Sequence, residues 1–292
     1  MLKIPEYIFK GAYAYDGAGV KLKRIFGGQE SYRYTDPFLL LDNFGSSNPE
    51  EYLKGFPWHP HRGIETVTYA IKGKVSHRDS EDNSGIIYSG DVQWMTAGSG
   101  IFHEEMPHYI EDKDKQMIDP EMAGFQLWIN IPAREKMKTP VYRPMKSKDI
   151  PVIRENNIDA KVISGIFDKV NGKYSGGEQD ISYYHIKMEP ESSMDYLTKK
   201  YYKTIIYTIN GEISINNQKY EPGNAIIFSI DGSEIRIKSD DYSEFLLLNG
   251  KPIKEDIFWY GPIVMNNRSQ IEEAINDLNS NKFIRDKKPV FE

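Results

Sequence analysis

Two pairs of residues, far apart in the chain, limit how it can fold. His59 and His61 are separated by one residue, and so are His103 and Glu105. Successive side chains of an extended strand point to opposite faces, so each pair shares one face if its segment is a strand. Residues two apart lie about 6.6 Å apart along a strand, and two imidazoles that lean inward can reach one ion at about 2.0–2.2 Å. The pairs therefore predict two neighbouring β-segments that aim three imidazoles and one carboxylate at one metal ion.

Proline and glycine residues around the pairs favour this extended geometry. Pro60 cannot donate to a sheet ladder and biases His59 towards an extended conformation, so its segment is expected at a sheet edge or a bulge. A lone buried histidine is more often a packed core residue than a ligand. Three of the six histidines and a carboxylate fall in two such pairs, and this favours a metal site over that interpretation. The other histidines lack a partner at ligand spacing and are expected to be structural.

Short β-rich runs alternate with turn residues along most of the chain, as is typical of β-sandwiches and barrels. Such runs lie at residues 66–71, 85–88, 92–96 and 125–131, and they resume at 160–165, 181–188, 202–209, 225–229 and 244–248. Residues 133–150 are dense in Lys, Arg and Pro and predict a linker. Ser269 and Glu272 have capping-box spacing, and an apolar stripe follows at helical intervals. The sequence therefore predicts a helix over about 269–280, with its stripe packed into the core.

Six runs resemble, in order, those of the pirin family within the cupin superfamily. The runs are 36–42 (DPFLLLD), 59–63 (HPHRG), 90–98 (GDVQWMTAG), 103–107 (HEEMP), 126–128 (QLW) and 260–266 (YGPIVMN). The resemblance covers the chain from about residue 36 to its end. It implies an all-β bicupin with two β-barrel domains, at 1–132 and 151–292, joined by the linker 133–150 and carrying a short C-terminal helix.

The resemblance also implies the ligands and the metal. Position by position, the metal ligands of the family fall on His59, His61, His103 and Glu105, the same four that strand geometry selects. They would hold one divalent first-row metal, with Fe(II) as the first choice and Ni, Co, Cu, Mn or Zn as the others that suit nitrogen and oxygen donors. The chain has no cysteine, so thiolate ligands are excluded. Glu105 could also act as a base, and Glu65, of the same strand parity as the histidines, is expected to orient one of them or handle a proton, or else to be a salt-bridged strand residue.

The second half of the chain is weakly similar to the first. The corresponding strand, glycine and strand runs are 71–76 with 209–214, and 88–91 with 221–224. An alignment on these glycines places Leu197, Lys199, Arg236 and Lys238 at the positions of the four ligands. None of these side chains is a typical metal ligand. The second barrel is therefore expected to lack a metal, with cationic side chains where the ion would be.

Two classes of function follow from the resemblance. Some family members are flavonol (quercetin) 2,3-dioxygenases, so a metal-dependent dioxygenase is expected, with a small aromatic substrate and O₂ as its partners. An octahedral ion with four protein ligands leaves two positions for them. Eukaryotic members are described as nuclear transcription co-regulators, so the alternative is a non-catalytic regulator whose metal oxidation state alters a protein-binding surface. A tetrahedral zinc would be coordinatively full, and the site would then be structural.

Composition narrows the partners and the compartment. A net charge of −6 argues against a large basic nucleic-acid footprint, so any transcriptional action would run through protein partners. No apolar run approaches the ~20 residues that a membrane span needs, and the N-terminus has no secretory pattern. We therefore expect a cytoplasmic protein that binds no membrane, with the nucleus as a further compartment if the source is eukaryotic.

Overall fold

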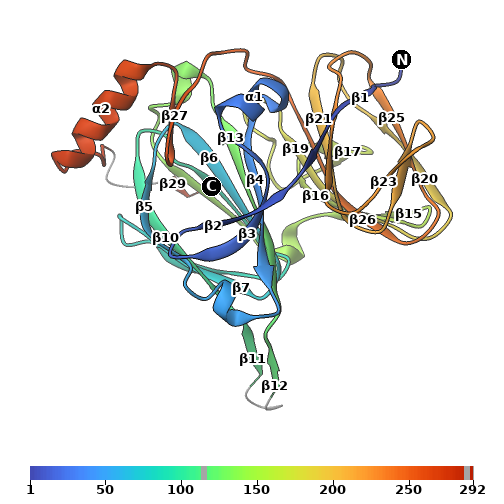
Figure 1. Cartoon of the computed structure of the whole chain (residues 1–292), viewed down its shortest axis with the longest axis horizontal. Helices are drawn as coiled ribbons and strands as arrows, with labels where there is room; N and C mark the ends of the chain where they lie inside the picture. The colour runs from blue at the N-terminus through green and yellow to red at the C-terminus, as the bar shows by residue number, and fades with distance from the viewer. Residues whose placement is uncertain (113–116, 286–289, 292) are drawn as a thin grey trace. The chain divides into compact units, whose positions relative to one another are not determined.

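The structure, a computed structural model, describes residues 1–112, 117–285 and 290–291, and it consists mainly of β-strands (Figure 1). The chain divides into two compact units. Unit 1 contains residues 1–11, 33–37 and 148–253, and unit 2 contains residues 12–32, 38–147 and 254–292. Each unit has a large and a small sheet, antiparallel except for the parallel pair β14 and β29 in unit 2, with an apolar core, so the predicted all-β class is confirmed. None of the helices in the described part of the chain is long and apolar enough to cross a membrane.

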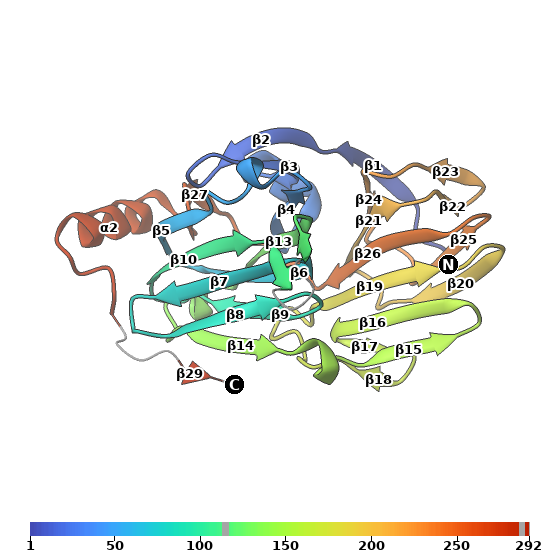
Figure 2. The same ribbon diagram turned by 90° about the horizontal axis from the view of Figure 1, so that it is seen from below.

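Unit 2 carries the predicted ligands and contains the larger sheet. In spatial order its strands are β2 (Ala12–Asp16), β3 (Val20–Gly27), β4 (Phe38–Ser46), β13 (Met122–Asn130), β6 (Ile64–Lys72), β9 (Val92–Thr96), β14 (Val141–Met145) and β29 (Val290–Phe291). The second sheet consists of β5 (Phe56–His61), β10 (Ile101–His108), β7 (Lys74–Asp79) and β8 (Ser84–Tyr88). Figure 2 shows β10, β7 and β8 side by side.

Smaller elements complete unit 2. They are η1 (Pro49–Glu51), η2 (Ala133–Glu135), the hairpins β11 (Ile110–Asp112) with β12 (Met117–Asp119) and β27 (Phe258–Tyr260) with β28 (Ile263–Met265), and α2 (Arg268–Asn279). The helix α1 (Gln29–Thr35) begins in unit 2 and ends in a segment assigned to unit 1. The predicted C-terminal helix is therefore confirmed, but its N-cap is Asn267, whose side chain accepts from the Gln270 backbone, rather than Ser269. Ile271 and Ala274 are buried, so the apolar stripe packs into the core as predicted.

Unit 1 contains the second pair of sheets. The larger has the order β1 (Pro5–Lys10), β24 (Asn224–Phe228), β21 (Lys203–Asn210), β26 (Ser243–Gly250), β19 (Ser182–Met188), β16 (Ile158–Ser164) and β15 (Val152–Glu155). The smaller has the order β20 (Ser192–Leu197), β25 (Glu234–Ser239), β22 (Ile213–Ile215) and β23 (Gln218–Tyr220). The short pair β17 (Ile166–Phe167) and β18 (Val170–Asn171) adjoins them, and η3 (Ser147–Asp149) precedes β15 in the chain.

The compact units differ from the continuous ranges 1–132 and 151–292 that were predicted. The first strand, β1, pairs with β24 of unit 1, and residues 254–292 belong to unit 2. The predicted linker 133–150 contains β14, which pairs antiparallel with β9. An open sheet edge takes up any strand whose backbone can pair with it, however distant in the chain, and no local pattern encodes that choice.

The four residues predicted to replace ligands in the second barrel lie on its outer face. Leu197 is 73% exposed, and the side chains of Lys199, Arg236 and Lys238 are exposed as well. Their strand neighbours, including Ile235, point into the apolar core instead. This placement was wrong because a shift of one residue in a strand alignment moves every side chain to the opposite face.

Candidate metal centre

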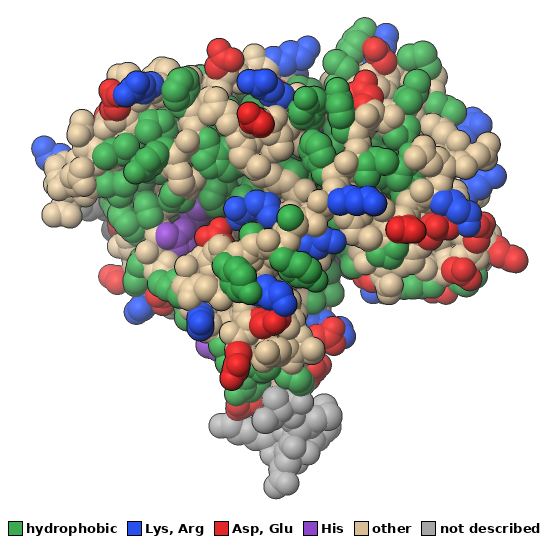
Figure 3. Space-filling model, viewed as in Figure 1, with side chains coloured by type: hydrophobic (Ala, Val, Ile, Leu, Met, Phe, Trp, Pro, Cys, Tyr) green, Lys and Arg blue, Asp and Glu red, His purple; other side chains and the backbone are tan. Residues whose placement is uncertain are grey.

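Histidine side chains reach the surface of unit 2 beside an apolar area, as Figure 3 shows. Strands β5 and β10 bring them together, because these strands pair antiparallel with His103 directly opposite His59. β5 is the edge strand of its sheet, as Pro60 predicts. Gly63 follows with φ +78°, a left-handed conformation that suits glycine, where the chain turns from β5 into β6. Local sequence and pairing thus place both ligand pairs at one corner of the unit.

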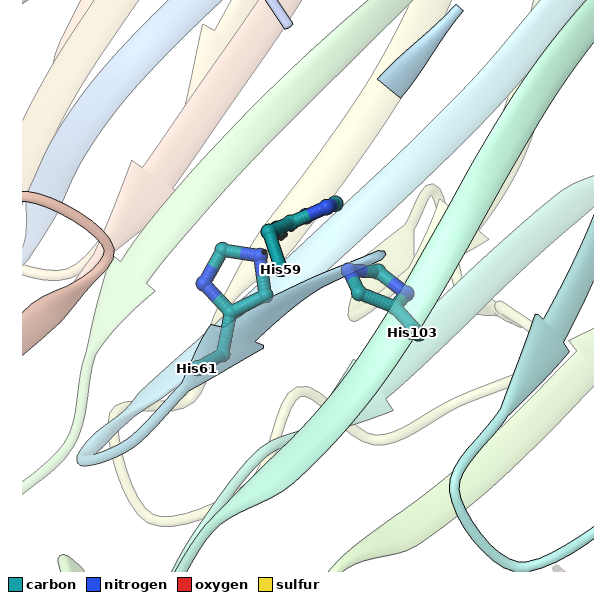
Figure 4. A group of neighbouring side chains, drawn as sticks. All are labelled: His59, His61 and His103. Carbon is teal, nitrogen blue, oxygen red and sulfur yellow. Dashed lines mark hydrogen bonds between the residues drawn. The ribbon is translucent and has the colours of Figure 1, made fainter. Parts of the chain in front are cut away.

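The three predicted histidine ligands form one cluster (Figure 4). Each ring offers a nitrogen, and these three nitrogens lie within 4.8 Å of one another. The Nε2 atoms of His59 and His61 are 3.0 Å apart. The ring of His103 lies 4.4 Å from that of His59 and 5.0 Å from that of His61, measured between centroids. The structure therefore brings together three of the four residues that the spacing selected.

Backbone carbonyls decide the tautomers of two of these rings. The Nδ1 atom of His59 is 2.8 Å from the Pro57 carbonyl oxygen, and that of His61 is 3.1 Å from the Pro262 carbonyl oxygen. A carbonyl can only accept, so each Nδ1 carries a hydrogen, and the neutral form of each ring, the form that binds metal, has its lone pair on Nε2. Two lone pairs then face each other at 3.0 Å, an arrangement that a cation between them would stabilise.

His103 supplies the second sign of a metal site. It is 1% exposed, and among the described residues neither of its ring nitrogens has a hydrogen-bond partner. An unsatisfied buried polar group costs about 1–3 kcal/mol. Burial, with the neighbouring histidines, lowers the pKa values of His61 and His103 well below the ordinary value, so both rings are neutral and ready to ligate. These donors fit a first-row divalent ion.

Glu105, the predicted fourth ligand, lies on the same buried face of β10 as His103. A bulge between the two residues shifts the pairing with β5. The Glu105 carboxylate accepts hydrogen bonds from Thr68 Oγ1 at 2.6 Å and from Gln126 Nε2 at 2.9 Å, and burial raises its pKa. Each of its oxygens retains a further lone pair, but the carboxylate is not part of the three-histidine group. Its role as a ligand or base stays a prediction.

Glu65 is buried on β6. Its carboxylate accepts from Trp94 Nε1 at 2.9 Å and from Thr96 Oγ1 at 2.6 Å, two residues on the neighbouring strand β9. These bonds join the two strands inside the barrel. The proposed role of Glu65 towards a histidine stays a prediction.

A cavity of about 620 Å³ borders the site. It lies within the range of about 300–1,000 Å³ typical of small-molecule sites. The residues that line it include His59, His61, Glu105, Thr68, Gln126, Arg24, Asp42, Leu40, Phe44, Phe56, Trp128 and Trp259. Most of this wall is apolar or aromatic, and the polar groups gather near the histidines and at the Arg24–Asp42 ion pair. The arrangement suits a planar, mainly apolar molecule with a few polar groups.

Two tryptophans beside the site were not predicted from the sequence. The Trp128 ring lies 5.0 Å from His61, nearly perpendicular to it, and Trp259 stacks on Trp128 at 5.9 Å. Trp128 has the same parity on β13 as Gln126, so strand alternation could have placed both on one face. Trp259 lies in the segment that follows residue 254, and no local signal shows that this segment returns to the first barrel.

Two family models match the chain. The model described as Pirin matches residues 19–129, and the Pirin C-terminal cupin domain matches residues 183–284. A relative from Thermoplasma acidophilum named "Putative quercetin 2,3-dioxygenase" is 42% identical over 262 residues, which is 85% of this chain and 100% of the relative.

Two solved structures are similar to this one. A quercetin 2,3-dioxygenase from Acinetobacter baumannii has a TM-score of 0.88 and 31% identity, over 97% of this chain and 99% of that chain. A bacterial pirin from Escherichia coli in complex with nickel(II) has a TM-score of 0.65 and 22% identity, over 84% and 98%, and this likeness shows the fold alone. The two family matches and the 42% identity show that this chain belongs to the pirin family.

Proposed function

We propose that this chain is a metal-dependent dioxygenase that opens a quercetin-type ring with O₂. The observation that carries the proposal is the cluster of three histidines, with two Nε2 atoms 3.0 Å apart, beside a cavity of the size that holds a small aromatic molecule. A solved structure named quercetin 2,3-dioxygenase and a relative named "Putative quercetin 2,3-dioxygenase" support this substrate class.

Four residues would hold the metal in this proposal: His59, His61, His103 and Glu105. Fe(II) is our first choice, and the other first-row ions suit the same donors. The E. coli pirin was solved in complex with nickel(II), so nickel belongs in any test. A bound ion would lower the pKa of a coordinated substrate hydroxyl and, if redox-active, conduct electrons to oxygen.

The chain's own residues orient the fourth ligand and shape the cavity. Hydrogen bonds from Thr68 and Gln126 hold the Glu105 carboxylate in one orientation. The stacked indoles of Trp128 and Trp259 form a flat apolar wall, on which an aromatic ring can lie while water is excluded.

Turnover of quercetin tests the proposal directly. Metal-free protein is loaded with Fe(II), Ni(II), Co(II) or Cu(II) and supplied with quercetin under air, and oxygen uptake is followed together with carbon monoxide release. With at least one metal we expect one carbon monoxide released per O₂ consumed, because both atoms of O₂ enter the products as one ring carbon leaves. If the protein binds metal tightly but none of its metal forms turns over quercetin, the proposal is contradicted and a regulatory role is favoured.

Trp259 is expected to contribute to substrate binding. Trp259→Ala should raise the KM for quercetin about 10-fold, because an aromatic contact is worth about 0.5–1.5 kcal/mol beyond its buried area. Metal affinity should stay within about twofold, since Trp259 is not a ligand. Phe258→Ala is the matched control, because Phe258 lies on the same hairpin and is exposed. An unchanged KM in Trp259→Ala would count against this wall as the substrate surface.

A further inference from the structure

The segment that follows residue 254 contacts the corner that carries His61. The His61 Nδ1 atom donates to the Pro262 carbonyl at 3.1 Å, and the Val264 backbone N–H donates to the Arg62 carbonyl at 3.2 Å. Arg62 and Ile263 form a parallel β-bridge. In both views of the fold, α2 and β27 lie beside β5 (Figure 1, Figure 2). The carbonyl that decides the His61 tautomer therefore belongs to the turn between β27 and β28, 201 positions away in sequence.

Arg62 connects this corner to α2. It is 1% exposed, and its guanidinium donates to the Ser99 and Phe283 carbonyls at 2.7 and 2.8 Å and to Asp277 Oδ2 at 2.8 Å. The same guanidinium lies 4.2 Å from the centre of the Phe283 ring. A buried charge is costly unless it is paired, and Asp277 supplies the carboxylate that pairs with it.

We infer that Asp277 of α2 is a positioning residue for the metal site, which acts through Arg62 and β28 on the His61 ring. Arg62 directly follows His61, so the position of the Arg62 guanidinium fixes the position of the backbone at the end of β5. The same backbone pairs with β28, which holds the Pro262 carbonyl against His61 Nδ1. Hydrogen bonds of this kind to a ligating histidine fix its ring and its tautomer. The inference rests on the proposed metal centre and is independent of the substrate.

The chain offers a matched control on the same helix. Arg285 pairs with both Asp277 and Glu273. Among the ion pairs of the described residues, Glu273 pairs with Arg285, and it acts on Arg62 only as a more distant charge. Glu273→Gln therefore disturbs the outer ion pair of α2 while the Arg62 contact stays intact, and Asp277→Asn removes the charge that faces Arg62. Asp277→Glu keeps the carboxylate.

The experiment measures metal affinity and the rate at which the His61 Nδ1 hydrogen exchanges with water, and it uses no substrate. Full-length, metal-free variants are titrated with Co(II) and Ni(II) against a competing chelator, and the exchange of the His61 Nδ1 hydrogen with water is followed by NMR in the Co(II) form. We expect Asp277→Asn to lower the affinity for both Co(II) and Ni(II) 10- to 100-fold, which is the usual effect of losing a residue that supports a metal ligand. Exchange of the His61 hydrogen should accelerate, Glu273→Gln should stay within about twofold of wild type, and Asp277→Glu should recover most of the affinity.

Three results would overturn the inference. Asp277→Asn could keep the wild-type affinity and exchange rate, or Glu273→Gln could weaken binding equally, which would point to a general loosening of α2. Wild-type protein that binds neither ion would overturn the inference together with the metal centre. If Asp277→Asn fails to fold, Arg62→Lys, which keeps the charge and loses the planar fork, is expected to weaken binding similarly. Because no substrate is used, absence of quercetin turnover leaves these readouts unchanged.

Discussion

His103→Ala is expected to weaken metal binding by more than about 100-fold and to abolish dioxygenase turnover. The ring is buried, and its nitrogens have no other partner among the described residues, so no protein group nearby replaces it. Apparent binding energies of about 10–16 kcal/mol for four-ligand zinc sites correspond to about 3 kcal/mol per ligand, or a factor of more than about 100. Chelator competition with Co(II) or Ni(II) measures the affinity, and oxygen uptake measures the turnover.

His108→Ala serves as the control, since His108 lies on the same strand β10 with the opposite parity. Its ring contacts the Ser76 hydroxyl at 3.0 Å and is outside the three-histidine group. We expect this variant to bind metal within about twofold of wild type. A His103→Ala protein that retains wild-type affinity would remove the metal centre from unit 2 and the proposed function with it.

Lys136→Met is expected to lower the free energy of unfolding of unit 2 by about 3 kcal/mol. Lys136 is fully buried, and its Nζ donates to the Gly63 and Val264 carbonyls and to Asn130 Oδ1 at 2.6–2.9 Å. Depriving a buried acceptor of a donor costs about 1–3 kcal/mol, and removing the buried amine offsets part of that cost. All four tryptophans, at positions 58, 94, 128 and 259, belong to unit 2, so their fluorescence during urea denaturation reports on this unit.

Lys138→Met is the matched control, because Lys138 lies two residues along and its partly exposed side chain pairs with Glu135 at 3.8 Å. Exposed pairs of this kind contribute about 0–1 kcal/mol. We expect a change within that range. Equal unfolding midpoints for Lys136→Met and Lys138→Met would show that the three acceptors do not depend on the buried lysine.

The Lys136 contribution should also depend on pH. Burial lowers its pKa to about 7, and the nearby Glu255 opposes the shift, whereas an unfolded lysine titrates near about 10.4. Between these values the unfolded chain binds more protons, so the unfolding free energy of wild type relative to Lys136→Met should rise with pH by up to about 1.4 kcal/mol per unit. If the difference in unfolding free energy between wild type and Lys136→Met is the same from pH 7 to 10, the folded protein keeps Lys136 as an ammonium. The three hydrogen bonds of Nζ would then be the reason, because a neutral amine can donate only two of them.

Much of the candidate site could be predicted from residue spacing. The alternation of β10 places His103 and Glu105 on one buried face, and Pro60 correctly predicted an edge strand. The same spacing rule failed in the second barrel. There the alignment depended on two glycine turns and assigned Arg236 and Lys238 to inward-facing ligand positions, whereas the structure has both side chains on the outer face.

The sequence by itself determined the β class, the C-terminal helix, the family and the histidines that meet at one point, because side-chain direction along a strand depends only on local alternation. Only the tertiary structure decided what surrounds them. The Pro262 carbonyl on His61, the Asp277 carboxylate on Arg62 and the Trp259 wall all come from a segment about two hundred positions away. Such contacts depend on which surfaces bury each other when the whole chain packs, and no short stretch of residues encodes that outcome.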